Sequence, residues 1–450
     1  MALLFGSSNL DIQMCGIVDN IVFSKKSIWA FYEVDTTGYD FLNEASKASM
    51  LRSINQTFVN LVANRETELN CHLIVTNTPV DIDHWEEQYL KVSENWARKP
   101  GFNKFFADQV EYLKTREFLS RKVYIGIRIG DRYGVNAAGF FKELASGWKQ
   151  AYAYIQEFTK SLRISDYSVT EKEVSQAESP EKEFFSMMHN SALNCQRPEA
   201  EEIALIMKRT MYPAMPTPYL DVPANGRWGK GDIIRETGSD ITKNRRWTEI
   251  SQPIGGQILT GYRATLTFSK FPEQMSSPLS TPWIYMMQRI GIPFDMYARF
   301  AIIPSKSMKK KISRQKADIM DEAKNAGEVN IDAPLDLQED YQKAAELEQY
   351  ADKNNEPFLN GIYRMVITAP GEDELINIVD VVKTTYSNGG ITVTWTAGDQ
   401  QDLLLESMPG DDIREKSFMQ SSNTELIGAS GFNIYNKVGD DDRYNASRKR

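Results

Sequence analysis

Cysteine is scarce in this sequence, and long hydrophobic runs are absent from it. The 450 residues include only three cysteines, Cys15, Cys71 and Cys195, and no two of them lie close together. Such a sparse and odd set argues against a disulfide framework and is typical of a reducing compartment. No apolar run approaches the ~18 residues that cross a membrane, and the N-terminus lacks the features of a signal peptide. We therefore expect a cytoplasmic protein that reaches a membrane only through a partner.

Histidine is equally scarce, which limits the catalytic chemistry that the sequence predicts. His72, His84 and His189 are scattered, with no cysteine or carboxylate at the spacing of a metal site. Cys71 lies next to His72, but a cysteine nucleophile also needs a base and an oxyanion element, and neither is identifiable. The sequence therefore predicts no metal, no cofactor and no catalytic residue in this chain.

Length and charge set the remaining limits. At ~150 residues per domain, the length corresponds to about three domains. The hydrophobic content of 41% and charged content of 25% are ordinary for a globular protein. The net charge of −9 argues against nucleic-acid binding by the whole surface, although a local basic patch remains compatible with it.

One glycine-rich stretch, Ala224–Gly231, comes close to a phosphate-binding loop. That loop needs the pattern G-x-x-x-x-G-K-[ST] between a strand and a helix. Here Ala224 occupies the place of the first glycine, Gly231 removes the hydroxyl group, and a proline-rich segment precedes the motif. The pattern favours an ordinary loop.

Apolar periodicity divides the first 260 residues into three regions. Residues 1–130 are predicted to form a mixed α/β module, and residues 131–212 are mainly helical. A linker and strand region is predicted over residues 213–260, where prolines and glycines cluster. The predicted strands and helices are strands 17–23 and 28–34 around a Ser24–Ser27 turn, helix 41–63, strand 71–76, helices 83–96 and 103–119, strand 123–129, helix 144–162, a helix behind a Thr170–Glu173 capping box, and a helix after Glu199.

Gly361–Gly410 is the clearest segment. Ile362–Thr368 is a β-prone run, and Pro370-Gly371 ends it. Acidic residues then open a helix whose apolar positions Leu375, Val379, Val382 and Tyr386 recur at helical spacing. Alternating apolar and threonine residues from Ile391 to Thr396 predict a half-buried strand, so the segment is strand, helix, strand.

The same order appears upstream. Tyr262–Ser269 alternates as a strand does, Thr281-Pro282 opens a short helix to Ile290, and Met296–Ile303 is another strand. Together these elements predict a ferredoxin-like (split βαβ) module over residues 261–410. A helical-hairpin insertion at residues 305–356 interrupts it. The expected fold is thus α+β, with two mixed-sheet modules, a helical middle region and a polar tail over residues 411–450.

Two basic clusters are candidate partner interfaces. Lys309, Lys310 and Lys311 open the insertion, where they either contact phosphate groups or form the solvated face of a helix; the second interpretation is the more ordinary one. Arg245, Arg246 and Trp247 are residue types enriched at interface hot spots, but they also fit the edge of a strand that begins at Trp247.

The order of these elements resembles the N-terminal half of the large ATPases of type IV secretion and conjugative transfer systems, the CagE/TrbE/VirB family. The residues that carry the resemblance are the strands YRATLTFSKFP at Tyr262–Pro272 and MYARFAIIP at Met296–Pro304, the charged insertion, and the run QQDLLLESMPG at Gln400–Gly410. It covers residues 10–440 by pattern rather than by a diagnostic motif.

This resemblance implies the docking, or scaffold, portion of a conjugation ATPase, without catalysis of its own. In the family, ATP and Mg²⁺ bind a motor domain that follows this region. The implied partners are inner-membrane components of the channel, at the inner face of the cell membrane. Oligomers would form through the motor, and DNA would be involved only indirectly. The alternatives are a structural or interaction protein of a phage or mobile element, and an enzyme whose site is assembled from scattered residues.

Overall fold

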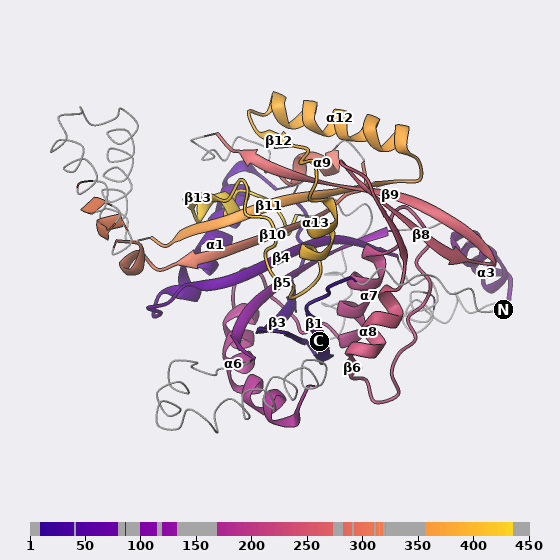
Figure 1. Ribbon diagram of the computed structural model, residues 1–450, viewed down its shortest axis with the longest axis horizontal. Coiled ribbons are helices and arrows are strands. Elements are labelled where there is room, and N and C mark those ends of the chain that lie inside the picture. Colours follow the sequence, from indigo (N-terminus) through magenta and orange to yellow (C-terminus); the bar gives the residue numbers. More distant parts are fainter. Residues whose placement is uncertain are drawn as a thin grey trace, which may run out of the picture.

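The computed structural model (Figure 1) describes most of the chain outside the predicted insertion. The described residues are 10–39, 42–79, 86, 100–114, 119–132, 169–272, 282–289, 292–309, 312–314, 316–317, 320 and 356–434. The predicted helices 83–96 and 144–162 and nearly all of the insertion therefore lie outside them.

One sheet of thirteen strands dominates the fold, and every pairing between its described strands is antiparallel. The strand order along the sheet is β6-β1-β2-β3-β5-β4-β10-β11-β9-β8-β7, with β12 paired to β9 and β13 to β11. The strands are β1 (Met14–Val18), β2 (Ile21–Ser24), β3 (Ser27–Glu33), β4 (Leu69–Pro79), β5 (Leu119–Asp131), β6 (Trp228–Gly229), β7 (Asp240–Lys243), β8 (Thr248–Ile254), β9 (Gln257–Lys270), β10 (Asp295–Ile303), β11 (Phe358–Ala369), β12 (Thr392–Thr394) and β13 (Gln420–Asn423).

The two sheets that we expected as separate modules are joined. β4 from the first module pairs with β10 from the second, over a register from Leu69 with Ile302 to Val75 with Met296. Each of these strands exposes a hydrogen-bonding edge within its own module, and the pairing satisfies both edges. The result is a mixed α/β fold built on a single sheet.

The sheet repeats one chain order on either side of this joint. In residues 14–210, which we call the N-half, a three-stranded meander β1-β2-β3 leads through α1 (Glu44–Val62) to β4, then through α3 (Pro100–Lys114) to β5, α6 (Glu171–His189) and α7 (Ala200–Thr210). In residues 240–406, the C-half, the meander β7-β8-β9 leads through α9 (Tyr285–Arg289) to β10, then to β11, α12 (Glu372–Asn388), β12 and α13 (Gln400–Glu406). The N-half also has a counterpart of β12, because Gln196 forms an isolated bridge with Glu33 at the end of β3.

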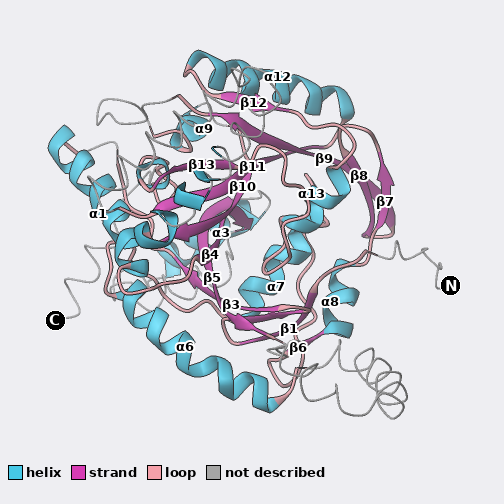
Figure 2. Cartoon of the chain, turned by 60° about the vertical axis from the view of Figure 1, so that its left-hand side comes forward, coloured by secondary structure: helices cyan, strands magenta, loops and turns pink. Residues whose placement is uncertain are grey.

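Helices cover both faces of the sheet, which curls around three of them (Figure 2). The inner face, on the hollow side, carries α7 (Ala200–Thr210), α8 (Lys230–Thr237) and α13 (Gln400–Glu406). The outer face packs on α1 (Glu44–Val62), α6 (Glu171–His189), α9 (Tyr285–Arg289), α12 (Glu372–Asn388) and α14 (Glu425–Gly428). α3 (Pro100–Lys114) lies between β4 and β5 in the sequence.

Local sequence explains where several helices start. The Asn43 side chain accepts a hydrogen bond from the Ser46 amide and begins α1, and the predicted Thr170–Glu173 capping box begins α6. α12 buries the four predicted residues from Leu375 to Tyr386, although several of its residues are β-branched. Burial against β9 and β11 outweighs the small propensity cost of those residues.

Three local predictions are wrong. Asp19, with a positive φ of 51°, breaks the expected strand 17–23 into β1 and β2. Pro100-Gly101 forms the start of α3, three residues before the expected start at Asn103, because proline fits the first helical turn. Leu119 belongs to β5 rather than to a helix. Gly229, expected in a loop, ends β6 and caps α8.

Residues 411–434, the described part of the segment predicted as a polar tail, contribute to the core instead. β13 adds to β11, and α14 packs beside α1. Leu426, Ile427 and Phe432 are buried in the outer-face core. These apolar residues are too few and too irregularly spaced to show a period.

Candidate functional site

Three arginines lie buried on the inner face of the C-half. Arg263 on β9, Arg299 on β10 and Arg364 on β11 are at most 3% exposed. The residues that alternate with them, such as Ala264 and Met365, face the outer core. On most sheets the polar face of such a strand meets water, but here α7 and α13 cover it. Each guanidinium group therefore needs partners inside the protein.

Arg364 has a complete set of partners. Its Nε lies 3.1 Å from Glu406 Oε1, and its Nη2 donates to the Glu415 carbonyl oxygen at 2.7 Å. Glu406 Oε2 in turn accepts from the backbone amides of Arg414 and Glu415, at 2.9 and 3.1 Å. This fully buried ion pair joins α13 to β11, which indicates a structural role.

Arg299 and His72 lie opposite each other on β10 and β4. The Arg299 guanidinium lies 5.1 Å from the ring centre of Trp29, and its Nε and Nη1 have no hydrogen-bond partner. Burial and the neighbouring Arg299 charge hold the pKa of His72 well below its ordinary value. The imidazole is therefore neutral, and both of its ring nitrogens are buried without a partner.

Cys71 and His72 do not form a catalytic pair. Cys71 belongs to the outer-face core, where burial raises the pKa of its thiol, whereas the His72 ring lies among the inner-face rings of Trp29, Phe31 and Tyr297. Successive residues of a strand point to opposite faces, so a thiol and an imidazole in this order cannot meet. This fully packed arrangement counts against an enzyme centred on these two residues.

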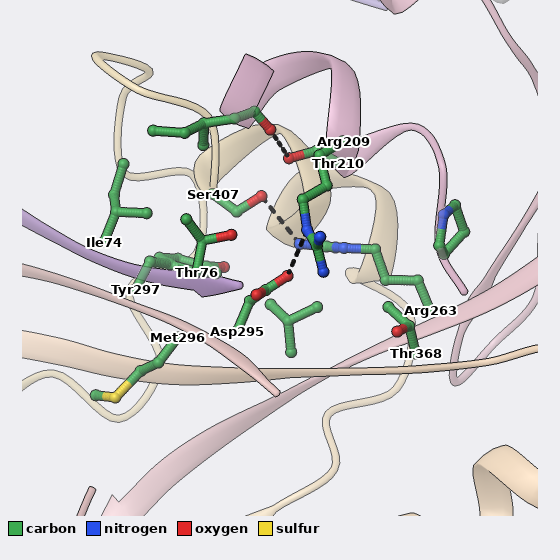
Figure 3. Close-up of a pocket in the computed structure, with 13 residues that line it drawn as sticks. Ile74, Thr76, Arg209, Thr210, Arg263, Asp295, Met296, Tyr297, Thr368 and Ser407 are labelled. Atoms are coloured by element: carbon green, nitrogen blue, oxygen red, sulfur yellow. Dashed lines mark hydrogen bonds and ion pairs between the residues drawn. The ribbon is translucent and has the colours of Figure 1, made fainter. Parts of the chain in front are cut away.

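A small cavity lies on the same inner face, between the sheet and the C-terminal ends of α7 and α13 (Figure 3). Its volume, counted as the space open to the centres of water molecules, is about 40 Å³. On this measure one water needs roughly 10–15 Å³, so the cavity has room for about three waters or one small ion. Its polar lining consists of Arg209 and Thr210 from α7, Asp295 and Tyr297 from β10, Arg263 from β9, Thr76, Thr368 and Ser407.

Two guanidinium groups point into this cavity (Figure 3). Arg209 Nε lies 3.9 Å from Asp295 Oδ2 and has no hydrogen-bond partner, so the two form a loose ion pair. Arg263 donates to Thr265 Oγ1 at 3.1 Å and to Ser407 Oγ at 2.9 Å, both uncharged. Among the described residues, no carboxylate lies within ion-pair distance of Arg263. Two positive charges therefore face one negative charge.

Burial is the main cause that lowers the pKa of Arg263 to about 10. The nearby Tyr297 and Asp295 act in the opposite direction and favour the charged form. A pKa of about 10 still leaves the guanidinium protonated near neutral pH. The cavity is therefore electropositive, as a site for an anion would be.

Arg245, Arg246 and Trp247 lie in the turn between β7 and β8, where they hold the segment after β12. The Trp395 indole donates to the Arg246 carbonyl oxygen at 2.5 Å, and the Gly398 amide donates to that of Arg245 at 2.7 Å. The Arg246 guanidinium lies 5.5 Å from the Trp395 ring centre. Trp247 is only 8% exposed, so it supports this turn rather than offering a contact surface.

The lysine cluster lies elsewhere. Lys309 belongs to a helical segment that includes residues 305–309 and follows β10, and Lys310 and Lys311 lie outside the described residues. β10 is separated from β8 by two strands, β11 and β9. Another lysine, Lys230 of the glycine-rich stretch, donates to the carbonyl oxygens of Ile12 and Met14. It thereby joins α8 to the segment that begins β1.

The sequence alone did not predict the cavity. The one available signal was Arg263, an arginine between apolar residues on the long strand predicted to begin at Tyr262. Arg209 and Asp295 gave none, because each is ordinary at the end of a helix or strand. Only the packing of α7 over β9 and β10 brings the three side chains together.

No group of histidine, cysteine, aspartate and glutamate side chains within the described ranges is arranged to hold a metal ion. Among the described helices, none has the length and apolar character to cross a membrane. No protein-family model matches the chain, and no curated protein matches it either.

Proposed function

We propose that this chain is the docking or scaffold portion of a conjugation, or type IV secretion, ATPase, with no catalysis of its own. The strand order of the C-half carries the proposal. Numbered in chain order, β9, β10, β11 and β12 are strands 1 to 4, and they lie across the sheet in the order β12-β9-β11-β10, that is 4-1-3-2, with α9 and α12 on one face. This order supports the ferredoxin-like module that the pattern of elements predicts for residues 261–410.

The residues that carry the resemblance also have connected roles in the C-half. Tyr262–Pro272 includes most of β9, and Met296–Pro304 includes most of β10. Gln400–Gly410 contains α13, whose Gln400 side chain exchanges hydrogen bonds with the Thr265 backbone of β9, at 2.8 and 3.0 Å. Segments that resemble the same family thus form one packing unit, which supports a common origin for them.

The docking surface that we propose is the β7–β8 turn with the segment after β12. The Arg246 side chain is exposed and lies over the ring of Trp395, whose indole N–H donates to the Arg246 carbonyl oxygen. A cation held in this way loses little side-chain entropy on binding a partner. Its partners would be channel proteins of the inner membrane, with the chain at the inner face of that membrane. ATP, Mg²⁺, oligomer contacts and any DNA contact would belong to the associated motor.

Direct binding to purified channel proteins tests this proposal. The inner-membrane proteins encoded beside this gene would be solubilised in detergent and titrated with the chain. We expect one-to-one binding that Arg246→Glu weakens by about tenfold or more, the effect of one lost charged contact. Arg128→Glu, which changes an exposed arginine on β5 far along the sheet, serves as the matched control.

Two results would argue against the proposal. ATP hydrolysis by the purified chain, above that of a mock preparation, would contradict a scaffold role. A chain that forms a regular assembly with itself, but binds none of the channel proteins, would instead favour a structural protein of a phage or mobile element.

A further inference from the structure

The lining of the cavity beneath α7 carries two positively charged side chains and a single carboxylate. Arg263 is 3% exposed and its two hydrogen bonds go to neutral hydroxyl groups. The single carboxylate of the lining, Asp295, lies nearer Arg209 and also accepts the Asn77 amide at 2.9 Å. A buried charge without a counter-charge is strongly disfavoured. The imbalance disappears if one anion occupies the cavity.

The lining specifies the kind of anion. Guanidinium groups match the oxygen atoms of phosphate or carboxylate better than a spherical ion, because their N–H groups form a planar fork. The Thr76 hydroxyl group lines the same space, whereas the hydroxyl groups of Thr210 and Ser407 donate to the carbonyl oxygens of Ile206 and Leu404. Guanidinium N–H groups around a volume of about three waters suit a compact oxyanion with several acceptor oxygens. A nucleotide or a peptide is too large for this space.

We propose that the cavity binds one inorganic oxyanion of phosphate size, held between Arg209 and Arg263. The two arginines come from different halves, because Arg209 ends α7 of the N-half and Arg263 belongs to β9 of the C-half. The bound anion thus links the inner helix of one half to the sheet of the other. Its binding stabilises the joint between the halves, independently of any role in secretion.

Titration of the intact chain with inorganic phosphate in chloride-free buffer tests this site. We expect one phosphate per chain by calorimetry and a melting temperature that rises with phosphate and saturates. Arg209→Gln, which keeps a polar side chain at the half-buried end of α7, should weaken the apparent affinity at least about tenfold, the effect of one lost charged contact.

Two further variants separate a bound anion from a general salt effect. Thr368→Met fills the cavity without changing any charge and should also abolish saturation. Arg128→Gln removes an exposed arginine that pairs with Asp131 outside the cavity, and it should leave phosphate binding unchanged. Crystals soaked in selenate, whose selenium scatters anomalously, should show one peak between Arg209 and Arg263 even if a variant fails to fold.

Three results would overturn the proposal. The first is the absence of saturable binding by the unmodified chain at millimolar phosphate. The second is an equal response of the unmodified chain, Arg209→Gln and Arg128→Gln, which would indicate ordinary ionic strength. The third is a selenate peak outside the cavity with none inside it.

Discussion

The N-half and the C-half share one chain order but fill the inner face of the sheet with different chemistry. In the N-half the inner face is aromatic and aliphatic, with Trp29, Phe31 and Ile74 packed against the apolar side of α7. In the C-half the equivalent face carries three arginines and is closed by α13 through Glu406 and Gln400. Strand order therefore does not determine what lies beneath the inner helices. Hydrophobic burial covers this face in the N-half, whereas hydrogen bonds and an ion pair through α13 cover it in the C-half.

The segment that follows each inner helix packs against the opposite half of the molecule. Beyond α7, Pro213 packs on Gly261 of β9 in the C-half, where a Cβ atom would lie 1.8 Å from the Pro213 carbonyl oxygen. Beyond α13, the Gly410 carbonyl oxygen accepts from Ser24 Oγ at 2.5 Å in the N-half. Each half therefore depends on the other, as the subunits of a two-fold dimer do.

The largest effect should come from breaking the buried ion pair of the C-half. Glu406→Ala leaves Arg364 charged and unpartnered, which should cost about 3–5 kcal/mol in the free energy of unfolding. Urea denaturation measures the loss. The control is Glu178→Ala in α6 of the N-half, where the pair with Lys182 at 3.1 Å is exposed and worth about 1 kcal/mol or less. Equal losses in the two variants would contradict the contrast between the halves.

A pH-dependent effect of up to roughly 3 kcal/mol is expected at Asp411, from the shift of its pKa. Burial raises the pKa of Asp411 from 3.8 to about 6, although Arg414 acts in the opposite direction. Because the folded pKa is the higher one, the native state favours the protonated acid. Its contribution to stability is therefore full below about pH 4 and is lost as pH rises through 6.

Asp411→Asn should remove this pH dependence, because an amide does not ionise. The measurement is the difference in unfolding free energy between variant and unmodified chain, from pH 4 to pH 7. The neighbouring Asp412, whose side chain is 45% exposed, supplies the control variant Asp412→Asn. A constant difference across this range would disprove the raised pKa.

A smaller, steric effect is expected where the segment after α7 packs on β9 of the C-half. Gly261→Ala places a methyl group against the Pro213 backbone and should cost about 1–3 kcal/mol, the usual cost of overpacking. Gly130→Ala on β5 of the N-half is the matched control, since nothing lies within 4 Å of its added methyl group. Equal losses of thermal stability in the two variants would show that the contact between Pro213 and Gly261 contributes little.

The smallest effect on stability is expected from the exposed Arg246 of the proposed docking surface. Arg246→Ala removes one exposed cation–π contact with Trp395 and should cost about 0.5–1 kcal/mol. Trp247→Ala, which empties a buried position, should cost about 3–5 kcal/mol. Chemical denaturation of both variants separates the exposed contact from its buried support. A large loss with Arg246→Ala would mean that this arginine is structural.

Much of the fold was predictable from local patterns, whereas the candidate site was not. Alternation predicted β4 and β9, apolar runs predicted β10 and β11, and helical spacing predicted α12 with its four buried residues. These patterns succeed because each reflects how a single element is buried. The cavity could not be predicted in this way. Its two arginines lie about 54 residues apart in the sequence, and no periodic pattern indicates that their side chains approach each other.

Local sequence is enough to specify the type and approximate limits of most described elements, since capping groups, turns and apolar periods act over a few residues. It also specifies that polar side chains occupy one face of β9. The cover over this face, the pairing of β4 with β10 in one sheet, and the packing of the segments after α7 and α13 on the opposite half arise only in the folded molecule. They do so because strand edges and sheet faces are satisfied by partners far along the chain. Such pairings leave no local signal.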